Sequence, residues 1–293
     1  MASAKQNSMR REIAGAIALL TDEHDFTAMR GYRTFPFDDY ESYLSEVESV
    51  LRTCAAEGGH ATVALFDPEE YVEFCSEMGL DPDALASRTR YTAEVATTSA
   101  TLPYEGQPLA ELVRDLIDEA VRMSTWEYAF TALARMGSCA TCGEEIGRSA
   151  FARATEMLAR IMDTAAPGKR NLVCSTSAAP ETLVAVLHVD ENSEGKTPLN
   201  ERETLEFTAV LALGLARHGA GGLVMRTSTP GIADRVYGWR ISEGGLWPLT
   251  AGEVFDAYCT DVQSGDIISP ESDVDYCEPP DLGGVAHSDG HSH

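Results

Sequence analysis

The sequence predicts an α+β protein. It has a helix-rich α/β part in residues 1–137, followed in residues 138–262 by an α-β-β-α-β-β part with an antiparallel sheet. Three observations indicate this class. Hydrophobic residues make up 44% of the chain, enough for a sizeable core. Helical hydrophobic spacing alternates with short apolar runs that contain β-branched residues. In the second half, the order helix, two strands, helix, two strands is that of an α+β domain.

The first half opens with two expected helices and a buried strand. Residues 8–20 are expected to form the first helix. The second begins at Asp38-Asp39 and ends near Gly58-Gly59, because apolar residues recur in it at helical spacing. The run from His60 to Phe66 is short, apolar and partly β-branched, which predicts a buried strand.

Helix signals dominate the rest of the first half. Asp67 can cap a helix whose first turn holds Pro68, and Gly79 closes that helix. Residues 84–98 fit a helix and a strand about equally well. Residues 109–136 predict a long helix that Gly137 ends, and the boundary between the two halves is expected near residue 137.

The second half is expected to pair two helices with two strand pairs. Asn200 and Glu203 resemble a capping box at the start of the second of these helices. The expected elements, in order, are a helix at 146–162, strands at 171–176 and 183–189, a helix at 205–216, and strands at 222–227 and 235–241.

The C-terminal segment is acidic and low in apolar residues. No Lys or Arg follows Arg240, whereas 11 Asp and Glu residues do. From about Gly265 the composition is mainly Ser, Pro, Gly and Asp, so residues 263–293 are expected to form a disordered acidic tail.

Charge and cysteine usage restrict the classes of partner. The chain carries 22 Lys and Arg against 47 Asp and Glu, a net charge of -25. Direct nucleic-acid binding and adsorption to an anionic membrane are therefore not expected. The apolar stretch at 13–20 is followed by acidic residues without a small-residue cleavage site, so a signal peptide is not expected, and it is too short for a membrane span. Seven dispersed cysteines do not resemble a disulfide framework, so we expect a cytoplasmic protein.

One motif has the spacing of a chemical site. Residues 139–143 read Cys-Ala-Thr-Cys-Gly, which lets the thiolates of Cys139 and Cys142 face one point. This is half of a tetrahedral zinc site, which needs four sulfur or nitrogen ligands. The remaining ligands are expected to be Cys174 and His188 of the predicted hairpin, with Cys259 and Cys277 as the alternative pair.

Two other interpretations of this motif stay open. Cys142 lies at the start of a predicted helix, whose dipole favours a thiolate and so a redox pair. However, thioredoxin-like motifs follow a strand, whereas a long predicted helix precedes this one. The other alternative is that the motif is a connecting loop with two inert thiols.

Three classes of function fit these observations. The first is a non-enzymatic cytoplasmic protein, regulatory or partner-binding, with a structural zinc site and a protein partner. The second is an enzyme of thiol redox or hydrolase type whose site is assembled from dispersed residues, such as His60, His188 and Asp190. The third is an acidic mimic of nucleic acid, which the net charge permits. The first is favoured because no complete catalytic set is visible in the sequence.

Overall fold

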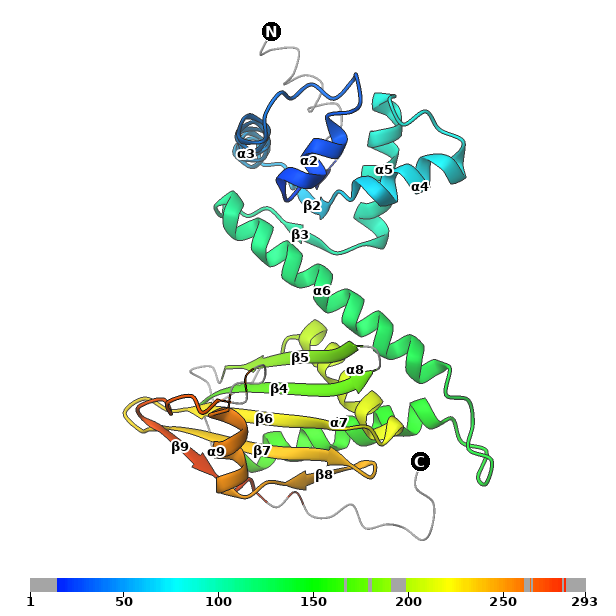
Figure 1. Ribbon diagram of the computed structural model, residues 1–293. Coiled ribbons are helices and arrows are strands. Elements are labelled where there is room, and N and C mark those ends of the chain that lie inside the picture. Colours follow the sequence, from blue (N-terminus) through cyan, green and yellow to red (C-terminus); the bar gives the residue numbers. More distant parts are fainter. Residues whose placement is uncertain are drawn as a thin grey trace. The chain divides into compact units, whose positions relative to one another are not determined.

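The chain is an α+β protein with two separate sheets, which confirms the predicted class (Figure 1). The computed structural model describes residues 15–165, 168–178, 181–190, 199–260, 264, 266–280 and 282. The chain divides into two compact units, residues 1–123 (unit 1) and 124–293 (unit 2). Helix α6, Leu109–Ala134, contributes residues to both units.

Unit 1 contains a three-stranded sheet and several helices. Its central strand β2 (Thr62–Leu65) pairs in parallel with β1 (Ala16–Leu19) and antiparallel with β3 (Thr101–Pro103). The connecting helices are α2 (Glu23–Met29), α3 (Tyr40–Ala56), α4 (Pro68–Met78) and α5 (Leu85–Thr98).

Local signals explain where the helices of unit 1 begin. The Asp67 side chain accepts the backbone N–H groups of Glu69 and Glu70, and Gly79 ends α4 in the left-handed conformation, as predicted. Asp39 caps α3 through the N–H of Ser42. Residues 85–98 form a helix because Tyr91 and Val95, one turn apart, are both buried.

The helix predicted at residues 8–20 is wrong at its C-terminal end. Ala16–Leu19 form strand β1, in register with Thr62–Leu65, and residues 8–14 lie outside the described residues. Gly15 has a φ of +99°, which an α-helix does not permit. Four consecutive apolar residues fit a buried parallel strand as well as a helix, and pairing with β2 decides between them.

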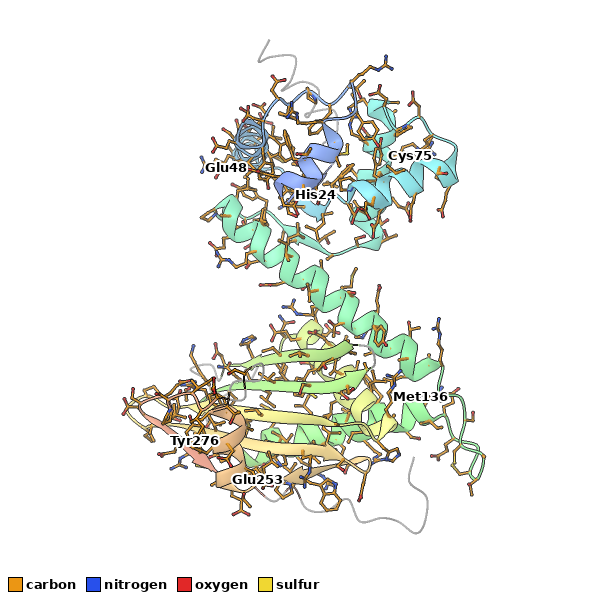
Figure 2. All side chains as sticks on the ribbon, in the orientation of Figure 1. His24, Glu48, Cys75, Met136, Glu253 and Tyr276 are labelled. Atoms are coloured by element: carbon orange, nitrogen blue, oxygen red, sulfur yellow. The ribbon has the colours of Figure 1, made fainter. Side chains whose placement is uncertain are left out.

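Aromatic packing fills the core of unit 1. Phe66 contacts Tyr71 and Tyr91 at centroid distances of 5.2 Å and 5.0 Å. Cys75 of α4, labelled in Figure 2, is buried in the same core. A second aromatic group from α2, α3 and the loop between them consists of Phe26, Phe35, Phe37, Tyr40 and Tyr43.

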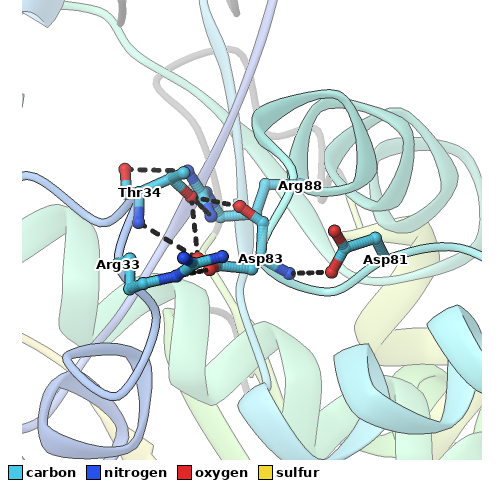
Figure 3. A network of polar contacts seen from close by, with 5 residues as sticks. All are labelled: Arg33, Thr34, Asp81, Asp83 and Arg88. Atoms are coloured by element: carbon cyan, nitrogen blue, oxygen red, sulfur yellow. Dashed lines mark hydrogen bonds and ion pairs between the residues drawn. The ribbon is translucent and has the colours of Figure 1, made fainter.

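A polar network joins the loop after α2 to the start of α5 (Figure 3). The buried Arg88 donates hydrogen bonds to Oγ1 and the carbonyl oxygen of Thr34, at 2.9 Å and 3.1 Å. Asp83 accepts from Nε of Arg33 at 2.7 Å and from the N–H of Thr34 at 3.1 Å. The Arg33 hydrogen bond is the main reason that the pKa of Asp83 lies below its usual value. The network satisfies Arg88 beside an apolar cavity of about 80 Å³.

Unit 2 is built on an antiparallel sheet of strand order β5-β4-β6-β7-β8. Helix α7 (Ile146–Thr164) packs on α8 (Glu201–Arg217), which packs on β4 and β5. The strands are β4 (Lys169–Ala178), β5 (Glu181–Val189), β6 (Gly221–Ser228), β7 (Asp234–Ser242) and β8 (Gly245–Pro248). The two predicted strand pairs and both predicted helices are confirmed, and Asn200 caps α8.

The structure differs from the sequence prediction within residues 263–293. Val274–Cys277 form strand β9, which pairs in parallel with Asp234–Tyr237 of β7. The Tyr276 ring, labelled in Figure 2, contacts Phe255 and Tyr258 of α9 (Ala251–Tyr258) at 5.2 Å and 5.8 Å. The average composition of this polar segment predicts disorder because it does not register the contact that one aromatic side chain, Tyr276, makes with α9. Residues 283–293 of the predicted tail lie outside the described residues.

No helix in the part of the chain that the structure describes is long and apolar enough to cross a membrane.

Candidate metal centre

The Cys-x-x-Cys motif lies on a tight hairpin between α6 and α7, in residues 137–146, which we call the cysteine hairpin. Its ends are joined by the bridge between Ser138 and Glu145. The N–H of Cys139 donates to the carbonyl of Glu144 at 2.8 Å, and the N–H of Gly143 donates to the carbonyl of Cys139 at 2.9 Å. Gly143, at a φ of +79°, provides the left-handed residue that this tight turn requires.

The hairpin directs two backbone N–H groups at one sulfur. Sγ of Cys139 accepts hydrogen bonds from the N–H groups of Cys142 and Thr141, the latter at 3.5 Å. These bonds stabilise the thiolate and lower the pKa of Cys139 below its usual value. Cys142 is exposed and Cys139 half-buried, so both sulfurs are near the surface. Thiolates are the form of cysteine that binds metals.

The structure brings Cys139 and Cys142 together, but it does not bring the other two predicted ligands to them. Cys174 lies on β4 opposite Ala185 and is fully buried, which raises the pKa of its thiol to about 12. His188 lies on β5 opposite Asn171, and its side chain is 64% exposed. Asn171 and Cys174 are three residues apart, so Cys174 and His188 face opposite sides of the sheet. The predicted four-ligand set is therefore not assembled in one chain.

The alternative pair of predicted ligands, Cys259 and Cys277, lies on other elements of unit 2. Cys259, at the end of α9, is buried and its Sγ lies 3.5 Å from the hydroxyl of Tyr276. Cys277 belongs to β9. Within the described ranges, no group of three or more His, Cys, Asp and Glu side chains is placed to hold a metal ion. The cysteine hairpin thus presents two thiols, whereas a structural zinc site needs four ligands.

The residues considered for catalysis lie on separate elements. His60 is an exposed residue of the loop before β2 in unit 1. In unit 2, the backbone N–H of His188 donates to Oε2 of Glu203 at 2.8 Å, and its Nδ1 lies 3.3 Å from the same oxygen. Asp190 lies 3.6 Å from Nζ of Lys169. These contacts join β5 to α8 and to β4, which is a structural role.

An apolar groove of about 530 Å³ runs along the base of the cysteine hairpin, between the end of α6 and the start of α7. The helices approach closely there because Gly147 has no side chain. A Cβ on Gly147 would lie 2.5 Å from the carbonyl oxygen of Leu133. Phe130, which is 54% exposed, stacks on Trp126 at a centroid distance of 5.5 Å. Phe151 of α7 also lines the groove.

Residues 4–107 match the model of a family described as Domain of unknown function (DUF8829). The match lies within unit 1, so the cysteine hairpin and the groove lie outside it. No curated protein and no solved structure matches the chain.

The groove was missed by sequence reasoning, although one signal for it was present. Trp126 and Phe130 are four residues apart on a long helix, a spacing that places both on one face. Helical periodicity is the same for a buried and an exposed aromatic stripe, so it does not distinguish them. The exposure of Phe130 depends on how α7 folds back on α6.

Proposed function

We propose that this protein is a cytoplasmic, non-enzymatic, partner-binding protein that holds zinc through Cys139 and Cys142. The observation that carries the proposal is the hairpin itself, in which backbone N–H groups of Thr141 and Cys142 already point at Sγ of Cys139. Hydrogen bonds to a metal-bound sulfur orient the ligand and compensate its charge. These contacts to Cys139 support the proposal that the hairpin holds a metal ion.

A thiol redox pair is the second candidate for the same two residues. It is supported by the lowered pKa of Cys139 and the exposure of Cys142. Two features favour zinc instead. Glu144 and Glu145 follow Gly143 in the same hairpin, and their negative charges favour a bound cation there. The hairpin also joins two helices and has the closed backbone geometry of a structural element.

Zinc content tests the proposal. The full chain, purified without a tag under reducing conditions, is expected to contain zinc by elemental mass spectrometry. Cys139→Ser and Cys142→Ser are each expected to lose it, because two thiolates alone already form half of the ligand set. The matched control is Cys54→Ser, which removes a partly buried thiol from α3 of unit 1 and is expected to keep the metal.

Two outcomes would contradict the proposal. Zinc that persists in the Cys139→Ser, Cys142→Ser double variant would show that the hairpin is not the site. A reduced protein without zinc that forms a Cys139–Cys142 disulfide on mild oxidation would support the redox pair instead.

A further inference from the structure

We infer that the cysteine hairpin binds zinc jointly with the same hairpin of a second copy of this chain, so that four thiolates from two protomers complete one site. This inference rests on the proposed zinc binding and names the partner. Structural zinc sites are closed by four protein ligands in tetrahedral geometry. One hairpin supplies two of the four, and in the described residues no other His, Cys, Asp or Glu joins them.

A second copy supplies the missing ligands with the correct chemistry. Two-fold symmetry is the commonest arrangement of identical subunits, and it places one patch against its own equivalent. Two Cys139 and Cys142 pairs related in this way form a four-sulfur set, which is one of the standard structural zinc environments. The sulfurs are accessible for it, because Cys142 is exposed and Cys139 is only half-buried.

The surface around the hairpin fits the same partner. The groove at its base is lined by Phe130, Leu133 and Phe151, and Phe130 is 54% exposed. An exposed apolar groove beside an incomplete metal site would be covered when the second hairpin joins the zinc. Arg148, whose Nη2 lies 2.8 Å from Oε2 of Glu145, adds a polar rim to this surface. Apolar centres with polar rims are typical of protein interfaces.

The net charge of the chain opposes its association without the metal. Each chain carries a net charge of -25, so two copies repel each other. Zinc replaces the four thiol protons, which leave to solvent, and the completed four-thiolate site carries a net charge of about -2, so it is the four zinc–sulfur bonds that hold the two hairpins together against this repulsion. The dimer is therefore expected to form when zinc is bound and to separate when it is removed.

Native mass spectrometry and light scattering of the full chain test this inference. With zinc and a non-thiol reductant, the expected particle contains two chains of 31.6 kDa and about one zinc, and it becomes a monomer after chelation. Cobalt titration is expected to reach its endpoint at about half an equivalent per chain, with absorption bands of a four-thiolate tetrahedral site. The Cys139→Ser, Cys142→Ser double variant is expected to stay monomeric.

The controls separate failure of this inference from failure of zinc binding. A monomer with about one zinc per chain, lost in Cys139→Ser, would overturn the dimer and leave the proposed function standing. Zinc lost on deletion of residues 283–293, which include His287, His291 and His293, would overturn it in favour of ligands from the same chain's end. No zinc at all would overturn both. Phe130→Ser is expected to weaken the dimer several-fold while the cobalt spectrum of the dimer is unchanged.

Discussion

At the scale of the residue, cysteines of unit 2 occupy opposite environments. Sγ of Cys139 accepts two backbone N–H groups near the surface, which lowers its pKa, whereas burial raises the pKa of Cys174 to about 12. A protonated thiol in an apolar core is inert, and a stabilised thiolate near solvent reacts. The same residue type therefore supports packing at one position and chemistry at the other.

This contrast predicts how the metal-free protein is alkylated. The alkylation rate of Cys139 is proportional to its thiolate fraction. The midpoint of the rate against pH is therefore expected at lower pH in the folded chain than in the same chain unfolded in urea. Cys174 is expected to stay unmodified throughout in the folded chain. Mass spectrometry of iodoacetamide-labelled peptides measures both residues in one sample. Equal midpoints in the folded and unfolded chain would show that the N–H groups do not stabilise the Cys139 thiolate.

The candidate site was partly predictable at this scale. The spacing of Cys139 and Cys142 and the glycine after them are visible in the sequence, and the hairpin has the turn they imply. The N–H groups that point at sulfur depend on backbone angles that residue types do not specify. Cys174 and His188 were predicted as ligands because both lie in one predicted hairpin. Which face each occupies depends on the register, and the turn that sets it is not evident from spacing.

At the scale of the element, the cysteine hairpin depends on the left-handed conformation of Gly143. Its φ is +79°, and a Cβ there would meet no atom within 4 Å, so Gly143→Ala changes the backbone preference alone. The strain is about 1 kcal/mol, and because the metal-free hairpin can open to relieve it whereas the zinc-bound hairpin cannot, zinc affinity is expected to fall by up to roughly five-fold.

Gly106→Ala is the matched control for that substitution. Gly106 has a φ of +97° and equally open surroundings, but it lies in unit 1, before α6. Both variants are expected to lose about 1 kcal/mol of local stability, while zinc affinity falls in Gly143→Ala only. Competition with a chromophoric chelator measures that affinity. An unchanged affinity in Gly143→Ala would show that the turn does not hold the ligands.

Elements with strong local signals were predicted well, and elements made by distant pairing were not. The α4 helix follows from Asp67 and Pro68, and the α8 helix begins at its Asn200 cap. The sequence of strand β1 predicts a helix because its four apolar residues have no periodicity of their own, whereas pairing with β2 makes them a strand. Strand β9 depends on Tyr276 meeting α9, a contact that no local pattern encodes.

At the scale of the whole molecule, the family match and the candidate site belong to different units. Residues 4–107 carry the match, and unit 2 carries the cysteine hairpin and the groove. The proposed zinc binding is therefore a property of unit 2 and not of the segment that matches the family. The net charge of -25 belongs to the whole chain, and it opposes any association between copies.

That charge predicts an unusual response of the zinc-bridged dimer to salt. Repulsion between two anionic chains is screened as the Debye length falls from about 30 Å at 0.01 M to about 3 Å at 1 M. At saturating zinc, the dissociation constant of the dimer is therefore expected to fall several-fold between low and high salt. Sedimentation equilibrium in the analytical ultracentrifuge measures it. The cobalt spectrum monitors the site itself and should not change. A dimer that weakens with salt would instead be held by ion pairs, such as those that Arg148 could form across the interface.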